Sequence, residues 1–422
     1  MEKLYYPQWN ETMYRGVCPS GLTVCVVKRP GFTKKLAYFV TDYGSIHTEF
    51  TCNGEKISAP AGVAHFLEHK MFDLPGRDVS EEFAALGAYP NAFTGYDMTA
   101  YYFSCTNNFE PCLRLLLEFV STGYFTEESV AKEQGIIGQE ISMSWDNPDH
   151  RIFELLMENM YPNHPIRTPI LGSRESIGKI TPEILTACHR AFYRPDNMLL
   201  CVVGDVDPDQ VMAIAEEMIP EKPTDTVSRA DRWEESMQPA CALAEEKMEV
   251  AMPMFQLGFK SEDAGFGPEA IRQEAIGDLA CEALFGESSA LYMRLYEEGV
   301  IDGSFGGGFE TVDGMALVTV SGDSETPEKV KDALLQEAAR LVKDGLEETD
   351  FLRMKRSALG RRLRDLDSFD STCFRICAYH FSGYDYFRFP EIYETVTRED
   401  ILEFIKRVVT PERCCMAVIK EV

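Results

Sequence analysis

Two segments of this chain, 216 residues apart, carry the same series of local structural signals. Thr181 and Thr397 each precede an amphipathic stretch, where a threonine hydroxyl can cap the first turn of a helix. Pro195 and Pro411 follow at the same offset, and each precedes an apolar run typical of a buried strand. Because the series recurs without a gap, it predicts an α+β fold with two homologous α/β domains from an internal duplication. The alternative is chance agreement, since helix–turn–strand units are common.

The predicted division of the chain follows this repeat. The first domain covers residues 1–219, a linker rich in Pro, Thr, Ser and charged residues covers 220–246, and the second domain covers 247–422. Apolar periodicity predicts strands at 22–28, 36–41, 99–105, 250–259, 304–309 and 315–321. It predicts helices at 63–72, 111–121, 127–145, 151–160, 269–285, 327–342 and 348–366.

Charge and cysteine content restrict the class of protein. The chain has 41 Lys and Arg against 69 Asp and Glu, a formal net charge of −28, which disfavours binding to nucleic acid. No apolar run is long enough to cross a membrane, and the first residues lack the pattern of a secretory signal. The 13 cysteines show no disulfide spacing and several stand in apolar runs, so they are interpreted as reduced. These features predict a cytoplasmic protein.

The strongest motif is His65-Phe66-Leu67-Glu68-His69. On a helix, residues four apart share a face, so His65 and His69 can bind one metal ion. Glu68 lies near that face and can accept a proton from a water molecule that zinc has acidified. The order H-x-x-E-H is that of the inverted zincins. The alternative is a helix whose two histidines only pack or cap.

A third ligand is expected for catalytic zinc, and the segment from Glu133 to Glu140 offers two carboxylates. Seven residues make two helical turns, so both side chains lie on one face. One could bind the metal while the other orients a histidine. A solvated acidic face is the alternative, which the apolar neighbours Ile136 and Ile137 weaken. The remaining histidines have no partner at ligand spacing: His47, His150, His164, His189 and His380.

The segment from Val63 to His69 resembles the metal-binding helix of the pitrilysin/insulinase family of zinc peptidases. The resemblance implies a clamshell of two related domains and one Zn²⁺ per chain, bound by His65, His69 and Glu140. It implies a general base at Glu68 and a supporting carboxylate at Glu133. It further implies that Asn91, Ala92, Phe93 and Thr94 belong to a strand that binds the peptide substrate.

One feature departs from the family pattern. Active members have an Arg and a Tyr, seven residues apart, in the C-terminal half, where they contact the substrate. The comparable segment here contains Tyr292, Arg294 and Tyr296, but residue 301, seven after Arg294, is Ile. The second half also lacks H-x-x-E-H. The sequence therefore predicts that this chain is the metal-bearing subunit of a two-subunit zinc endopeptidase. The missing Arg and Tyr would come from a homologous partner subunit, or the protein would be a homodimer.

The sequence leaves two alternatives to this function. The chain could be a catalytically weak or non-enzymatic structural subunit of a hetero-oligomer, although the complete set of His65, Glu68, His69 and Glu140 argues against it. A cysteine-dependent enzyme has little support, since no Cys stands at motif distance from a His. A peptide-cleavage assay with and without a partner distinguishes the two-subunit enzyme from the structural subunit.

Overall fold

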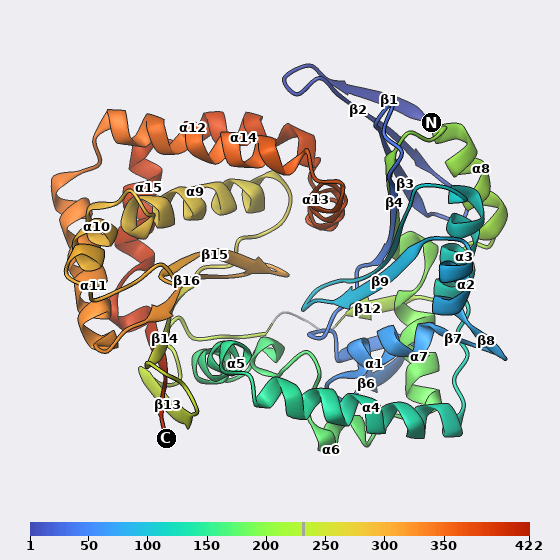
Figure 1. Cartoon of the computed structure of the whole chain (residues 1–422), viewed down its shortest axis with the longest axis horizontal. Helices are drawn as coiled ribbons and strands as arrows, with labels where there is room; N and C mark the ends of the chain where they lie inside the picture. The colour runs from blue at the N-terminus through green and yellow to red at the C-terminus, as the bar shows by residue number, and fades with distance from the viewer. Residues whose placement is uncertain (230–232) are drawn as a thin grey trace. The chain divides into compact units, whose positions relative to one another are not determined.

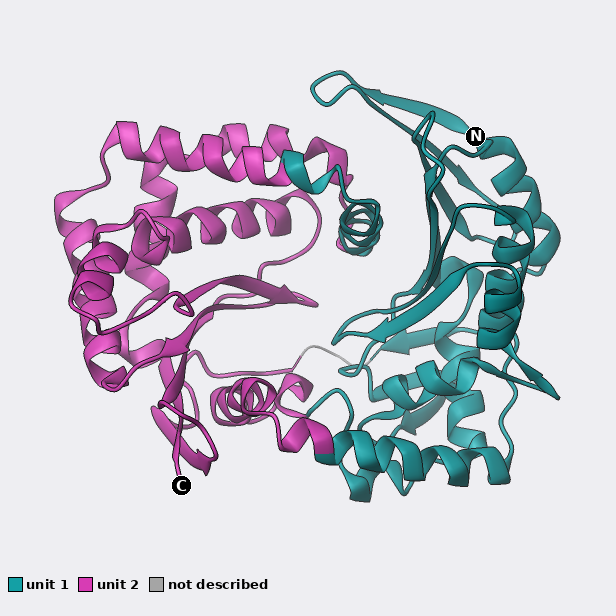
Figure 2. Ribbon diagram, in the orientation of Figure 1, with its two compact units in different colours: residues 1–142, 169–232, 363–381 teal, residues 143–168, 233–362, 382–422 magenta. Residues whose placement is uncertain are grey.

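The structure is a computed structural model that describes residues 1–229 and 233–422. These residues form two compact units, each assembled from separate stretches of the chain (Figure 2). Unit 1 contains residues 1–142, 169–232 and 363–381, and unit 2 contains residues 143–168, 233–362 and 382–422. Each unit has its own main sheet, so the class is mixed α+β, as predicted.

The main sheet of unit 1 has seven strands, in the spatial order β1-β2-β3-β11-β4-β10-β9 (Figure 1). Only β11 and β3 run parallel, and the other neighbours are antiparallel. Their bounds are β1 Glu2–Tyr6, β2 Glu11–Val17, β3 Thr23–Lys28, β4 Lys35–Thr41, β9 Tyr89–Thr94, β10 Thr99–Cys105 and β11 Met198–Gly204. The central strands are apolar on both faces because both faces are covered.

Helices cover both faces of this sheet. One face packs against α1 (Val63–Met71), α3 (Phe109–Ser121) and α8 (Pro208–Met218), which share its hydrophobic core. The other face receives α13 (Phe369–Phe381), which packs on β11 and β4. Cys201 of β11 and Cys373 of α13 meet there, with the thiol donating to the Cys201 carbonyl at 3.8 Å. The helix α13 was not predicted from the sequence.

The main sheet of unit 2 has the order β13-β17-β14-β16-β15. Its strands are β13 Leu243–Met248, β14 Met254–Ser261, β15 Gly306–Val312, β16 Met315–Asp323 and β17 Cys414–Glu421. On one face lie α9 (Pro268–Phe285), α11 (Pro327–Asp344) and α15 (Arg398–Val408), and on the other lies α5 (Pro148–Met160) (Figure 1). Gly258 of β14 is needed for this packing, because a Cβ there would lie 2.2 Å from the Met160 sulfur.

The two sheets share one pairing pattern. In each, a parallel pair (β3 with β11, β13 with β17) is followed by three antiparallel pairs. The helices α7 (Pro182–Phe192) and α15 have equal lengths and begin 216 residues apart. Thr181 and Thr397 cap them, accepting hydrogen bonds from the backbone N–H groups of Ile184 and Asp400. The local structure thus follows the sequence repeat in register.

The remaining strands and helices complete the two units. They are β5 (Glu49–Cys52), β6 (Glu55–Ser58), β7 (Asp73–Leu74), β8 (Arg77–Asp78), β12 (Val227–Arg229), α2 (Val79–Ala85), α4 (Glu127–Trp145), α6 (Arg174–Ile177), α10 (Ala290–Glu297), α12 (Glu348–Asp365) and α14 (Phe389–Thr395). Within the predicted linker 220–246, β12 pairs with β5 and the first residues of β13 pair with β17. The division into 1–219, 220–246 and 247–422 stays a prediction.

Most predicted elements are present with small shifts at their ends. The helix predicted at 127–145 is α4, residue for residue, and the strand predicted at 99–105 is β10. The strand predicted at 250–259 begins only at Met254, because Pro253 has no N–H for the ladder. All 13 cysteines are free, and all but Cys241 are buried. Across the described residues, no helix has both the length and the apolar character needed to traverse a bilayer.

Candidate metal centre

The helix α1 places two histidines side by side. It starts after Gly62, whose φ of 89° is in the left-handed region and where a Cβ would lie only 2.5 Å from the Leu171 carbonyl oxygen. His65 and His69 follow on the same face, with ring centroids 4.6 Å apart. His65 is buried and His69 is half-buried. The predicted pairing of the two imidazoles is therefore present in the geometry.

The helix α4 brings a carboxylate to both rings. Glu140 Oε1 lies 3.7 Å from His65 Nε2, and Glu140 Oε2 lies 3.6 Å from His69 Nε2. These ligand atoms all lie within 4.8 Å of one another, and no other trio of His, Cys, Asp or Glu side chains in the described residues does so. The three side chains form the candidate metal centre.

Glu133, two turns earlier on α4, occupies a different position. Its Oε1 accepts a hydrogen bond from His69 Nδ1 at 3.0 Å, on the ring nitrogen that points away from Glu140. A carboxylate in this position fixes the tautomer so that Nε2 keeps its lone pair for a metal. The sequence left the roles of Glu133 and Glu140 open, and this geometry favours Glu140 as the ligand and Glu133 as its support.

The two histidines have opposite electrostatic surroundings. Burial, together with the neighbouring His69, lowers the pKa of His65 to about 3, so its imidazole is neutral. Burial alone would also lower the pKa of His69, but the hydrogen bond and charge of Glu133, with Glu68 and Glu140, raise it overall. His69 is thus the position where negative charge from the surrounding carboxylates concentrates. A cation placed among these groups would be stabilised by the same charges.

Glu68 is held beside the cluster without being part of it. It is buried, and its Oε2 accepts a hydrogen bond from Thr94 Oγ1 at 2.5 Å. Burial raises the pKa of Glu68, against the opposing effects of Thr94 and His69. A carboxylate that is partly desolvated and fixed by one hydrogen bond is suited to accept a proton near neutral pH. The sequence offers no signal for this contact, since the two residues are 26 positions apart.

The residues fit a zinc ion. Two imidazole nitrogens and one carboxylate form the donor set of many catalytic zinc sites. Donors bound to a tetrahedral zinc at about 2.0–2.1 Å lie about 3.4 Å apart. The two His–Glu separations here are 3.6 and 3.7 Å, and all three donor atoms lie within 4.8 Å of one another. These separations exceed those of hydrogen bonds, so the three side chains converge without bonding one another. The neutral state of His65 also suits metal ligation.

The predicted substrate-binding residues lie next to this centre. Asn91, Ala92, Phe93 and Thr94 belong to β9, which pairs with β10 and ends the order of the sheet. An edge strand presents free backbone groups to which an extended peptide can pair. Of these four residues, Thr94 contacts a catalytic candidate, through its hydrogen bond to Glu68. Substrate binding by these residues stays a prediction.

Tyr292, Arg294 and Tyr296, which the sequence resemblance sets against the family's Arg and Tyr, lie on α10 in unit 2. Tyr292 and Tyr296 stack, with ring centroids 5.8 Å apart, and Tyr296 is exposed. Ile301, seven positions after Arg294, is buried. The chain therefore has no Arg and Tyr at this spacing, as the sequence indicated.

Comparison with known proteins identifies the family. Residues 57–174 match the family described as insulinase (peptidase family M16), and residues 179–358 match the M16 inactive domain. A Bacillus subtilis (strain 168) protein named uncharacterized zinc protease YmfH is 38% identical over 98% of this chain and 97% of its own length. This chain belongs to the M16 insulinase family of peptidases. The match to the inactive domain agrees with the missing metal motif in the second half of this M16 protein.

Solved structures agree with this assignment. The structure of a putative M16-like peptidase from Alicyclobacillus acidocaldarius has a TM-score of 0.94 and 32% identity, and covers 98% of this chain and 99% of that one. A protease from Helicobacter pylori has a TM-score of 0.82 at 17% identity, covers 97% of this chain and 99% of that one, and so shares the fold. The M16 fold therefore extends over nearly the whole chain.

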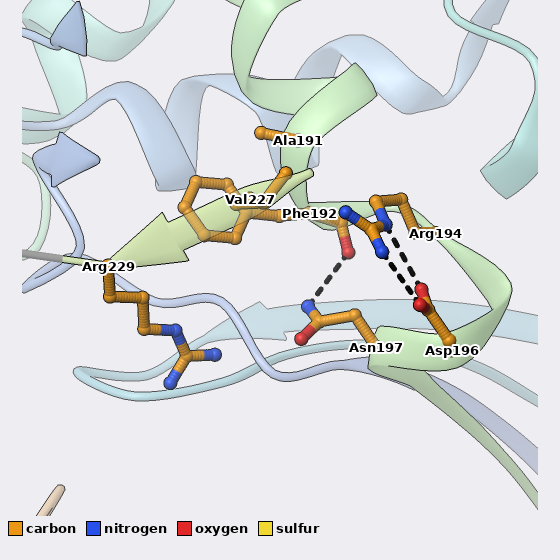
Figure 3. A pocket seen from close by; sticks show the side chains of 7 residues that line it. All are labelled: Ala191, Phe192, Arg194, Asp196, Asn197, Val227 and Arg229. Atoms are coloured by element: carbon orange, nitrogen blue, oxygen red, sulfur yellow. Dashed lines mark hydrogen bonds and ion pairs between the residues drawn. The ribbon is translucent and has the colours of Figure 1, made fainter. Parts of the chain in front are cut away.

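A second polar site of unit 1 differs from the metal centre. This cavity, of about 130 Å³, is lined by Arg194, Asp196, Asn197 and Arg229, among other residues (Figure 3). Arg194 pairs with Asp196 at 2.6 Å, and Arg229 pairs with Asp42 at 2.7 Å. Because each arginine already has a carboxylate, the cavity offers no surplus positive charge for an anion.

Proposed function

We propose that this M16 protein is a zinc-dependent endopeptidase. One observation carries the proposal: His65, His69 and Glu140 converge, while Glu68 is fixed beside them by Thr94. A structural subunit that binds no substrate would not need a buried, oriented carboxylate next to a metal-binding trio. The relatives named zinc proteases support the same function.

The chain's own residues define the steps they perform. His65, His69 and Glu140 would hold Zn²⁺, which when bound acidifies water and polarises a peptide carbonyl. Glu68 accepts the proton of the attacking water and passes it to the leaving amine. Thr94 holds one oxygen of Glu68, leaving the other for the proton. Glu133 keeps the ring of His69 in the ligating orientation.

The finer predictions extend this proposal. We propose that the chain is the metal-bearing subunit of a two-subunit enzyme, because α10 offers Tyr292, Arg294 and Tyr296 without the family's spacing. The alternative is a catalytically weak or structural subunit of a hetero-oligomer. We also propose the internal duplication, which the shared pairing pattern of the two sheets supports. The clamshell arrangement of the two domains stays a prediction.

Glu68→Gln tests the proposed function. The variant keeps the volume of the side chain but cannot accept the proton, so peptide cleavage should fall by about 10²- to 10⁴-fold. Zinc content should stay at one per chain, measured by elemental analysis. Glu81→Gln, on an exposed position of α2, is the matched control and should retain activity. Activity of Glu68→Gln within a few-fold of the wild type would rule out the general base.

A further inference from the structure

A short segment of unit 1, residues 171–180, contacts both helices that carry the metal centre. The chain returns to unit 1 at Pro169, after the stretch 143–168 that belongs to unit 2. The segment follows two residues later and contains the helix α6, beside α4 (Figure 1). We call residues 171–180 the brace segment, and its contacts with α1 and α4 lie within unit 1.

The contact with α1 is a close approach of two backbones. A Cβ at Gly62, the residue before α1, would lie 2.5 Å from the Leu171 carbonyl oxygen. A Cβ at Gly172 would lie 2.5 Å from the Ala61 carbonyl oxygen. Because neither position has room for a side chain, the brace segment fixes the place where α1 begins. His65 follows three residues after Gly62, in the first turn of that helix.

The contact with α4 is made of hydrogen bonds. Gln134 Nε2 donates to the carbonyl oxygens of Ile177 and Ile180, each at 3.2 Å. Arg174 Nη2 donates to Ser142 Oγ at 2.7 Å. Positions 134 and 142 of α4 lie on either side, along the helix, of the carboxylate that reaches both imidazole rings. The brace segment therefore holds α4 on both sides of that carboxylate.

Gly138 of α4 fits the same contact. It is buried, and a Cβ there would lie 3.1 Å from Arg174 Nη1. Glycine weakens a helix relative to alanine. At this position it leaves space for the guanidinium group close to the backbone of α4.

The metal centre depends on the spacing of the two helices, because α1 supplies His65 and His69 while α4 supplies Glu140. Ligand distances at a metal site are held to within about 0.2 Å. To turn an approach of 2.5 Å into an ordinary contact, the backbone would have to move by about 1 Å. A shift of that size at the start of α1 exceeds what the ligands of a zinc ion tolerate.

We propose that the brace segment positions the two metal-binding helices. Through Gly172 on one side, and through its bonds to Gln134 and Ser142 on the other, it sets the separation of α1 and α4. It contributes no ligand to the metal centre and acts through the helices alone. The proposal rests on the proposed function, because it presumes that the metal centre binds zinc.

Gly172→Ala tests the contact with α1. Gly87→Ala is the matched control, because its φ is 73° against 72° at Gly172 and an added Cβ would meet nothing within 4 Å. Both variants therefore carry the same strain of a left-handed alanine, and only Gly172→Ala also meets a neighbour. In chelator competition on the full chain, the zinc dissociation constant should rise by about tenfold or more in Gly172→Ala. It should stay within about twofold of the wild type in Gly87→Ala.

Cobalt gives a second measurement of the same pair, without hydrolysis. The visible absorption of a bound Co²⁺ ion depends on the geometry of its ligands. The spectrum of the Co²⁺-loaded chain should change in Gly172→Ala and match the wild type in Gly87→Ala. A substitution that only lowers the stability of unit 1 would leave the spectrum of the folded, loaded chain unchanged.

Gln134→Leu tests the contact with α4 independently, and the glutamine pair decides alone if Gly172→Ala does not fold. Loss of both hydrogen bonds should raise the zinc dissociation constant by about threefold or more. Gln139→Leu, at an exposed position of the same helix, should leave it unchanged. Equal zinc affinities within the folded glycine pair, or within the glutamine pair, would overturn the proposal and leave the proposed function standing. A wild type that binds no zinc would overturn both.

Discussion

Glu133 offers a quantitative test of the metal centre that does not depend on catalysis. Its carboxylate accepts the Nδ1–H of His69 at 3.0 Å, and its side chain is 13% exposed. A hydrogen bond to a charged group contributes about 1.5–3 kcal/mol. Part of this free energy is lost from zinc binding when the imidazole is no longer oriented. Supporting carboxylates of this kind raise metal affinity by about 10- to 100-fold. Glu133→Ala should therefore raise the zinc dissociation constant by about 10- to 100-fold.

Glu133→Gln refines the expected magnitude. The amide keeps a neutral acceptor for His69, and charge-assisted hydrogen bonds are about twice as strong as neutral ones. The glutamine variant should thus recover about half of the lost free energy, which leaves a loss of about three- to tenfold. The affinities should fall in the order wild type, Gln variant, Ala variant.

Competition with a zinc chelator of known affinity measures these constants on the purified chain. Glu128→Gln, at an exposed position of the same helix, is the control and should bind zinc like the wild type. Glu140→Ala should lose stoichiometric zinc. Two results would refute the reasoning: zinc affinity of Glu133→Ala within about twofold of the wild type, or full zinc occupancy in Glu140→Ala. The second result would move the ligand role to Glu133.

Three further predictions concern catalysis, partners and stability. Thr94→Val should lower kcat by about 10- to 100-fold at unchanged zinc content, because it loses a hydrogen bond to Glu68 of about 1.5–3 kcal/mol. Thr94→Ser keeps the hydroxyl and should retain most of the wild-type kcat. Equal kcat values for the two variants would contradict the role of Thr94 in orienting Glu68. The purified chain should cleave peptides poorly, with a rise of about tenfold or more when a homologous partner carrying the Arg and Tyr is added; a turnover of about 10 s⁻¹ from the chain alone would exclude the need for that partner. Gly277→Ala should destabilise unit 2 by about 1–3 kcal/mol in urea unfolding, because its Cβ would lie 2.2 Å from the Phe309 ring, whereas Gly360→Ala, with open space around it, should not.

Local periodicity determined much of this protein from the sequence alone. His65 and His69 share a face because they are four residues apart on a helix, and Glu133 and Glu140 share one because they are seven apart. The helices α7 and α15 begin where their threonine caps predict. Each of these features depends on chemistry within a few residues, which a sequence displays directly.

Packing between distant segments decided the rest. Glu133 and Glu140 are equivalent along the helix α4, so the sequence cannot assign their roles. The contact of α4 with α1 places Glu140 beside both imidazole rings and Glu133 behind the ring of His69. The assignment of α5 to unit 2 and of α13 to unit 1 crosses the order of the chain. A cavity of unit 2 brings together Asp149 and Asp323, which are more than 170 positions apart in the sequence. No local pattern encodes such neighbours, because burial of apolar faces selects them only when the whole chain folds.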